Sequence, residues 1–153
     1  MGIKFDSSIF PTLFPGRYNR LRFPVIPFMI KESNLIEIPF SVVPKLRIPI
    51  SLSFMQLLGL NTFKLFFKFF HLPQLIIYDF HIYELGKLPS YVGLPTIPKF
   101  GYYRAQRMHS NPANVFEEFV KYIILSKGYE SKYMEEVYNE IKPTAFTWSW
   151  TGD

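Results

Sequence analysis

The sequence predicts a mixed α/β fold of short elements in one domain. Thirteen prolines against eight glycines over 153 residues interrupt any long helix. Short aliphatic runs bounded by proline indicate strands, and longer runs with apolar residues at helical spacing indicate helices. The chain has no cysteine, which excludes disulfides, thiol nucleophiles and cysteine-bound metal centres.

Prolines dominate the first fifty residues. Residues 1–27 are predicted to form a loop region with one short strand at most, because Pro11, Pro15, Pro24, Pro27 and Gly16 break every period. The runs 35–39 and 46–50 are predicted strands, each interrupted by a proline that cannot donate to a ladder.

A predicted helix and a predicted strand follow. Residues 54–70 keep helical spacing, with a break expected at Gly59 and with Lys64 and Lys68 four apart on an outward face. After Pro73, the continuous apolar run 75–82 predicts a fully buried strand that places His81 near its C-terminal end.

The last part of the chain predicts an irregular connection and two amphipathic helices. Residues 83–112 are rich in proline and glycine, and Asn111 with Pro112 then predicts a helix start. That helix is expected to end at Gly128, and a second helix over 131–141 at Pro143. Residues 144–153 receive no assignment. Strands that alternate with helices place the chain in the α/β class.

The net charge is +5, and it is uneven. Residues 1–76 hold nine basic and three acidic side chains, and residues 77–153 hold eight and nine. The basic residues never cluster at the density of a nucleic-acid patch, so a solvated basic face is favoured over nucleic-acid binding. The apolar region 57–80 contains Lys64, Lys68 and Asp79, which argues against a membrane span. Nothing at the N-terminus is typical of a signal peptide, and a cytoplasmic location is expected.

Three histidines are candidates for chemistry, at positions 71, 81 and 109, but their spacing predicts no metal site. His81 is the candidate catalytic residue, because a strand end can present an imidazole for proton transfer. From the residues alone, a core histidine bonded to a carbonyl is equally favoured. The segment Asp6-Ser7-Ser8 is a carboxylate beside two hydroxyls, and turn chemistry is its favoured explanation.

Four segments taken in order resemble the C-terminal half of NodB-type polysaccharide deacetylases. They are Gly2-Ile3-Lys4-Phe5-Asp6-Ser7-Ser8-Ile9-Phe10-Pro11, Leu35-Ile36-Glu37-Ile38-Pro39, Leu46-Arg47-Ile48-Pro49 and Ile77-Tyr78-Asp79-Phe80-His81-Ile82-Tyr83-Glu84. The resemblance covers roughly residues 1–141 and implies a partial distorted (β/α) barrel. It implies hydrolysis of N-acetyl groups on sugars, in which a divalent metal such as zinc polarises the amide and a histidine, here His81, protonates the leaving amine. It gives Asp6 an architectural role.

Other motifs of that family are missing. The chain has no Asp-Asp pair and no His-x-x-x-His pair, which would supply the base and the metal ligands. A segment similar to the family's arginine motif, Gly101-Tyr102-Tyr103-Arg104-Ala105, lies after His81, where the family's order does not place it. We therefore expect residues 1–143 to be the C-terminal part of a deacetylase-like domain, with 144–153 as a tail. It should hold no cofactor itself, be inactive alone, and associate with an N-terminal half or with a second copy.

The alternative is a non-catalytic remnant of the same fold that binds saccharide or protein. Aromatic faces pack against sugars. The candidate side chains are Tyr18, Tyr83, Tyr91, Tyr102 and Tyr103. A basic surface protein that binds membranes or nucleic acid is a third hypothesis, and it ranks last.

Overall fold

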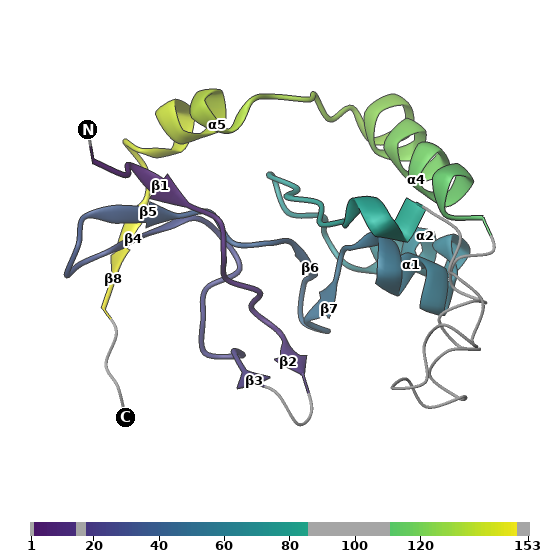
Figure 1. Ribbon diagram of the computed structural model, residues 1–153, viewed down its shortest axis with the longest axis horizontal. Helices are drawn as coiled ribbons and strands as arrows, with labels where there is room; N and C mark the ends of the chain where they lie inside the picture. The colour runs from purple at the N-terminus through teal and green to yellow at the C-terminus, as the bar shows by residue number, and fades with distance from the viewer. Residues whose placement is uncertain (1, 15–17, 86–110, 150–153) are drawn as a thin grey trace. The chain divides into compact units, whose positions relative to one another are not determined.

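The computed structural model describes residues 2–14, 18–85 and 111–149 (Figure 1). The chain divides into two compact units. The first comprises Met1–Ile50, Phe67–Tyr78 and Glu130–Asp153, and the second comprises Ser51–Phe66 and Asp79–Tyr129. Each unit is described by itself.

A mixed four-stranded sheet organises the first unit. Its strands, in spatial order, are β1 (Phe5–Asp6), β5 (Leu35–Glu37), β4 (Phe28–Ile30) and β8 (Phe146–Trp148). β4 and β5 form an antiparallel hairpin whose turn holds Asn34 at a positive φ of 51°. β1 joins β5 in parallel, and β8 joins β4 in parallel. The tail, which has no assignment from sequence, thus contributes an edge strand.

Alternate residues of β4 face two different apolar clusters, as the period of a strand requires. Phe28, which is completely buried, packs with Ile9 and Phe23 and against Trp148. Met29, the next residue, packs in a cluster that contains buried side chains of β5, of the residue directly after β5 and of the helix α5 (Met134–Ile141). These buried side chains are Ile36, Ile38, Val137 and Tyr138. The amphipathic helix predicted over 131–141 is confirmed as α5, which starts three residues later.

Short antiparallel pairs complete the strands that the structure describes. β2 (Leu13–Phe14) pairs with β3 (Tyr18–Asn19), and β6 (Val42–Val43) pairs with β7 (Ile48–Pro49). The strands predicted over 35–39 and 46–50 are confirmed as β5 and β7, both shorter than expected. The expectation of one strand at most in residues 1–27 was wrong, because β1, β2 and β3 all lie there.

Two consecutive helices begin the second unit, α1 (Leu52–Leu58) and α2 (Leu60–Phe69), whose last three residues belong to the first unit. The predicted break is confirmed, since Gly59 between them has φ of +88°. Ser51 caps α1 by accepting a hydrogen bond from the N–H of Phe54 at 3.5 Å.

The helix predicted after Asn111 is confirmed as α4 (Pro112–Lys121), with Pro112 in its first turn and no capping bond from the Asn111 side chain. It continues as one π-helical turn, η3 (Tyr122–Ser126), that the sequence did not predict. The chain leaves the helix at Gly128, whose φ is +74°, as expected of a C-terminal glycine.

The prediction of a buried strand over 75–82 was wrong. These residues bond instead to a side chain and to loop backbone: the Ser41 hydroxyl donates to the Leu75 carbonyl at 3.3 Å and accepts from the Ile77 N–H at 2.8 Å. An isolated parallel bridge joins Asp79 to Ser51, and residues 75–79 are half-buried. The apolar run therefore indicated partial burial. Its backbone groups bond to the Ser41 hydroxyl and to loop backbone instead of to a neighbouring strand.

The α/β class is thus confirmed, whereas the partial barrel stays a prediction, because the described strands form no closed barrel. In the part of the chain that the structure describes, no helix has the length and apolar character needed to cross a bilayer.

Candidate functional site

His81 lies at the start of a tight helical turn in the second unit. It follows the Ser51–Asp79 bridge and directly precedes the 3-10 helix η1 (Ile82–Leu85). Its side chain is exposed. Its backbone N–H donates to the Glu84 carboxylate at 2.8 Å, and its carbonyl accepts from the Glu84 N–H at 2.8 Å. A glutamate three residues after the capping position bonds back to that position's N–H, which is one half of a capping box.

The same carboxylate binds the beginning of α1. Glu84 is only 5% exposed, and its second oxygen accepts a hydrogen bond from the hydroxyl of Ser53. The Leu52 N–H, one residue earlier, donates to the Asp79 carbonyl at 3.1 Å. Two contacts therefore fix the segment that carries His81 against the first turn of α1.

This arrangement fixes the backbone of His81 and leaves its imidazole exposed to solvent. Both oxygens of Glu84 are engaged with the protein, so Glu84 is a positioning residue. The His81 side chain is exposed, and its backbone N–H is held by Glu84. The site can therefore offer a proton donor or acceptor to a molecule that approaches from solvent.

Asp6 takes part in a turn at the end of β1 in the first unit. Its carboxylate accepts from the Ser7 N–H at 2.8 Å and from the Ser8 hydroxyl at 2.9 Å. The Ser7 hydroxyl donates to the Ile38 carbonyl at 2.7 Å. Asp6 thus has the local bonds of the turn chemistry that the sequence favoured.

Glu37, which the sequence did not single out as a site residue, is the second buried glutamate. It is 1% exposed, and one of its oxygens accepts from the N–H groups of Ser8 at 3.1 Å and Ile9 at 2.8 Å. Burial raises the pKa of Glu37; the two N–H groups oppose that shift, the Asp6 charge adds to it and Arg20 opposes it. A signal was present in the sequence, since a carboxylate in an apolar run requires buried donors.

The other candidate residues do not gather around His81. His71 is exposed in the first unit, and His109 and the segment 101–105 lie outside the described residues. Of the tyrosines proposed for sugar binding, Tyr91, Tyr102 and Tyr103 also lie outside them, as do the side chains of Tyr18 and Tyr83. Within the described ranges no three histidine or carboxylate side chains come together, so these residues do not fit a zinc site.

No family model matches the chain, and no match was found among curated proteins or among solved structures.

Proposed function

We propose that this chain provides the C-terminal part of a NodB-type polysaccharide deacetylase, with His81 as the general acid. The observation that carries the proposal is the pair of hydrogen bonds accepted by the buried Glu84 carboxylate, one from the His81 backbone N–H and one from the Ser53 hydroxyl. It supports a rigid backbone beneath an exposed imidazole at the position of the motif that resembles the family's histidine segment.

The role of His81 follows from the chemistry of amide cleavage. Water adds to the acetyl carbon, and the C–N bond then breaks with nitrogen as the leaving atom. An unprotonated amine anion leaves very poorly, so the nitrogen needs a proton as the bond breaks. His81 as imidazolium supplies that proton and becomes neutral imidazole. A second proton-transfer group must restore it.

The base and the metal ligands must come from residues other than those described. The described residues do not fit a metal site. The role proposed for this chain is therefore limited to proton donation by His81. The partner that supplies the base and the metal ligands is an N-terminal half or a second copy of the chain. It could pair with the sheet at β1. Phe5–Asp6 is an edge of the described sheet and pairs with β5 on one side. Edge strands accept further strands.

The test is reconstitution. The chain is mixed with the N-terminal half of a NodB-type enzyme that carries the Asp-Asp and His-x-x-x-His motifs, and zinc is added. Acetate release from an N-acetylglucosamine oligomer is measured after size-exclusion chromatography has isolated the complex. We expect His81→Ala to lower the rate by about 100-fold or more, the usual range for a general acid.

His71→Ala is the matched control, since it removes another exposed histidine and should leave the rate unchanged. Equal rates for His81→Ala and the unaltered chain would refute the role of His81. A purified, zinc-loaded complex that releases no acetate would refute the deacetylase proposal. Binding of the oligomer to the chain alone, insensitive to chelator and to His81→Ala, would favour the saccharide-binding remnant.

A further inference from the structure

Two lysines from different elements of the second unit meet at one tyrosine ring. The Lys64 ammonium, from α2, lies 5.4 Å from the centroid of the Tyr122 ring. The Lys127 ammonium, directly after η3, lies 5.5 Å from the same centroid. Tyr122 and Lys64 are half-buried and Lys127 is exposed. Two ammonium groups thus lie near one half-buried ring.

Both Tyr122 and Lys127 belong to the end of the helix. Tyr122 is the first residue of the π-helical turn η3, and Lys127 is the residue directly after it. The Lys127 N–H donates to the Ile124 carbonyl and so closes the helix. The second ammonium is therefore carried by a residue whose backbone is held by the end of the π-turn, and π-turns are frequent at functional sites.

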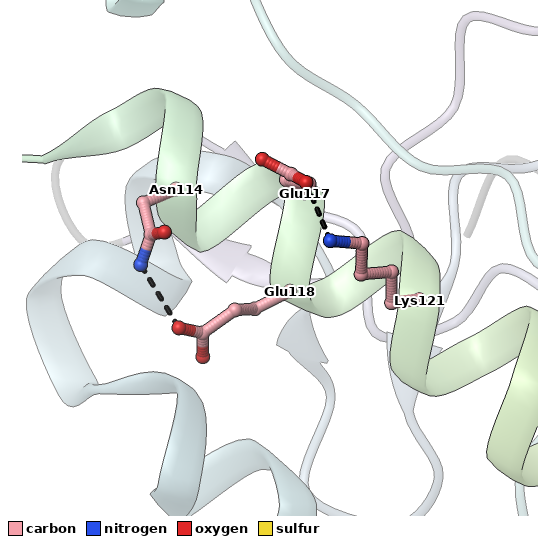
Figure 2. A network of polar contacts seen from close by, with 4 residues as sticks. All are labelled: Asn114, Glu117, Glu118 and Lys121. Atoms are coloured by element: carbon pink, nitrogen blue, oxygen red, sulfur yellow. Dashed lines mark hydrogen bonds and ion pairs between the residues drawn. The ribbon is translucent and has the colours of Figure 1, made fainter.

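The carboxylates of α4 have partners within the same helix, as Figure 2 shows. The Lys121 ammonium donates to Glu117 at 2.5 Å, and the Asn114 amide donates to Glu118 at 2.9 Å. The other ion pair of the described residues joins Lys132 to Glu140. Within the described part of the chain, therefore, no carboxylate forms an ion pair with Lys64 or Lys127.

We propose that Lys64, Lys127 and Tyr122 form a binding site for a phosphate-class oxyanion. A dianion that contacts both ammonium groups is attracted to each of them. Each ammonium has three donors, and the contact with the ring uses them weakly. A phosphate group offers several acceptor oxygens for charge-assisted hydrogen bonds. This inference is independent of the deacetylase proposal, because it needs neither His81 nor a partner half.

The test is a titration of the full ¹⁵N-labelled chain with inorganic phosphate at constant ionic strength. We expect saturable shifts of the backbone amides of residues 122–128. Lys64→Gln and Lys127→Gln should each weaken binding about tenfold, as expected for the loss of a hydrogen bond between charged groups. Lys68→Gln is the matched control, since it removes the same charge from an exposed site on the same helix, and it should change the dissociation constant less than about twofold.

Vesicles distinguish the sources of the phosphate. One supporting outcome is binding to phosphatidate vesicles but not to pure phosphatidylcholine vesicles. If Lys64→Gln and Lys127→Gln weaken this binding and Lys68→Gln does not, the ligand of the site is a lipid headgroup. Binding of inorganic phosphate without any vesicle binding supports it with a soluble phosphate as its ligand. Non-saturable shifts, or an equal loss of affinity in Lys68→Gln, would overturn the proposal and leave only diffuse attraction to a basic surface.

Discussion

The two buried glutamates perform different tasks with the same chemical group. In the first unit, one oxygen of Glu37 accepts two backbone N–H groups, from Ser8 and Ile9, almost thirty residues away in the chain. In the second unit, Glu84 uses both oxygens, one for the His81 N–H three residues earlier and one for the Ser53 hydroxyl. Both carboxylates are nearly inaccessible to solvent.

The two glutamates differ in which segment of the chain their hydrogen bonds hold. The Glu37 bonds close a turn that follows β1 and hold it to β5, so their effect should be on stability. The Glu84 bonds hold a backbone whose side chain is exposed, so their effect should be on the placement of His81. Burial of a carboxylate alone therefore does not identify a functional site. Its partners do.

The largest effect is expected from Glu37→Ala. The substitution leaves the N–H groups of Ser8 and Ile9 buried without an acceptor and removes buried volume, so the free energy of unfolding should fall by about 3 kcal/mol. Urea unfolding followed by circular dichroism measures it. Glu37→Gln keeps an acceptor oxygen and should cost about 1 kcal/mol. Equal losses in the two variants would show that the hydrogen bonds contribute little.

Glu84→Ala should separate placement from stability. Two hydrogen bonds are lost, one of them local, so we expect a loss of about 2 kcal/mol together with faster hydrogen exchange at the His81 N–H. Ser53→Ala is the control, because it removes the remote contact and keeps the bond to His81, so exchange at His81 should change little. Unchanged exchange in Glu84→Ala would show that Glu84 does not fix the His81 backbone.

Sequence patterns predicted the elements whose signals are local. The break at Gly59 followed from glycine chemistry, and the start of α4 at Pro112 followed from the fixed φ of proline. β8 and the pairing of β1 with β5 depend on contacts between distant segments, which no local pattern reveals. The run 75–82 failed for a related reason: its apolar residues predict burial, but the Ser41 hydroxyl replaces a strand partner.

The candidate site was predictable in part. His81 and Glu84 form a local pattern of a residue and a glutamate three positions later, which predicts a bond between side chain and backbone. Ser53 could not be predicted, because its contact with Glu84 joins residues 31 positions apart. The contact of Lys64 with Tyr122 joins residues of two different helices, for which helical spacing in the sequence gives no signal.

The pH dependence of stability should show the raised pKa of Glu37. Because that pKa is higher in the folded chain, the folded state binds the proton more tightly than the unfolded state. The resulting stabilisation is present below the unfolded pKa and is lost as pH rises through the folded pKa. Relative to Glu37→Gln, the unaltered chain should therefore lose stability over the pH range above the ordinary glutamate pKa, as measured by urea unfolding. A constant difference across this range would contradict the shift.

The smallest effect, with the opposite sign, is expected at Glu117 on the exposed face of α4. The Lys121 ammonium, by hydrogen bond and by charge, lowers the pKa of Glu117. The contribution of Glu117 to stability is therefore present above the unfolded pKa and is lost as pH falls through the folded pKa.

In a carbon-detected NMR titration, the Glu117 carboxyl should have its midpoint below the ordinary glutamate value, and that of Glu37 should lie above it. Lys121→Gln should return Glu117 to the ordinary value without moving Glu37, and 1 M salt should do the same in part because the pair is exposed. A Glu117 midpoint that responds to neither change would show that the ion pair does not persist in solution.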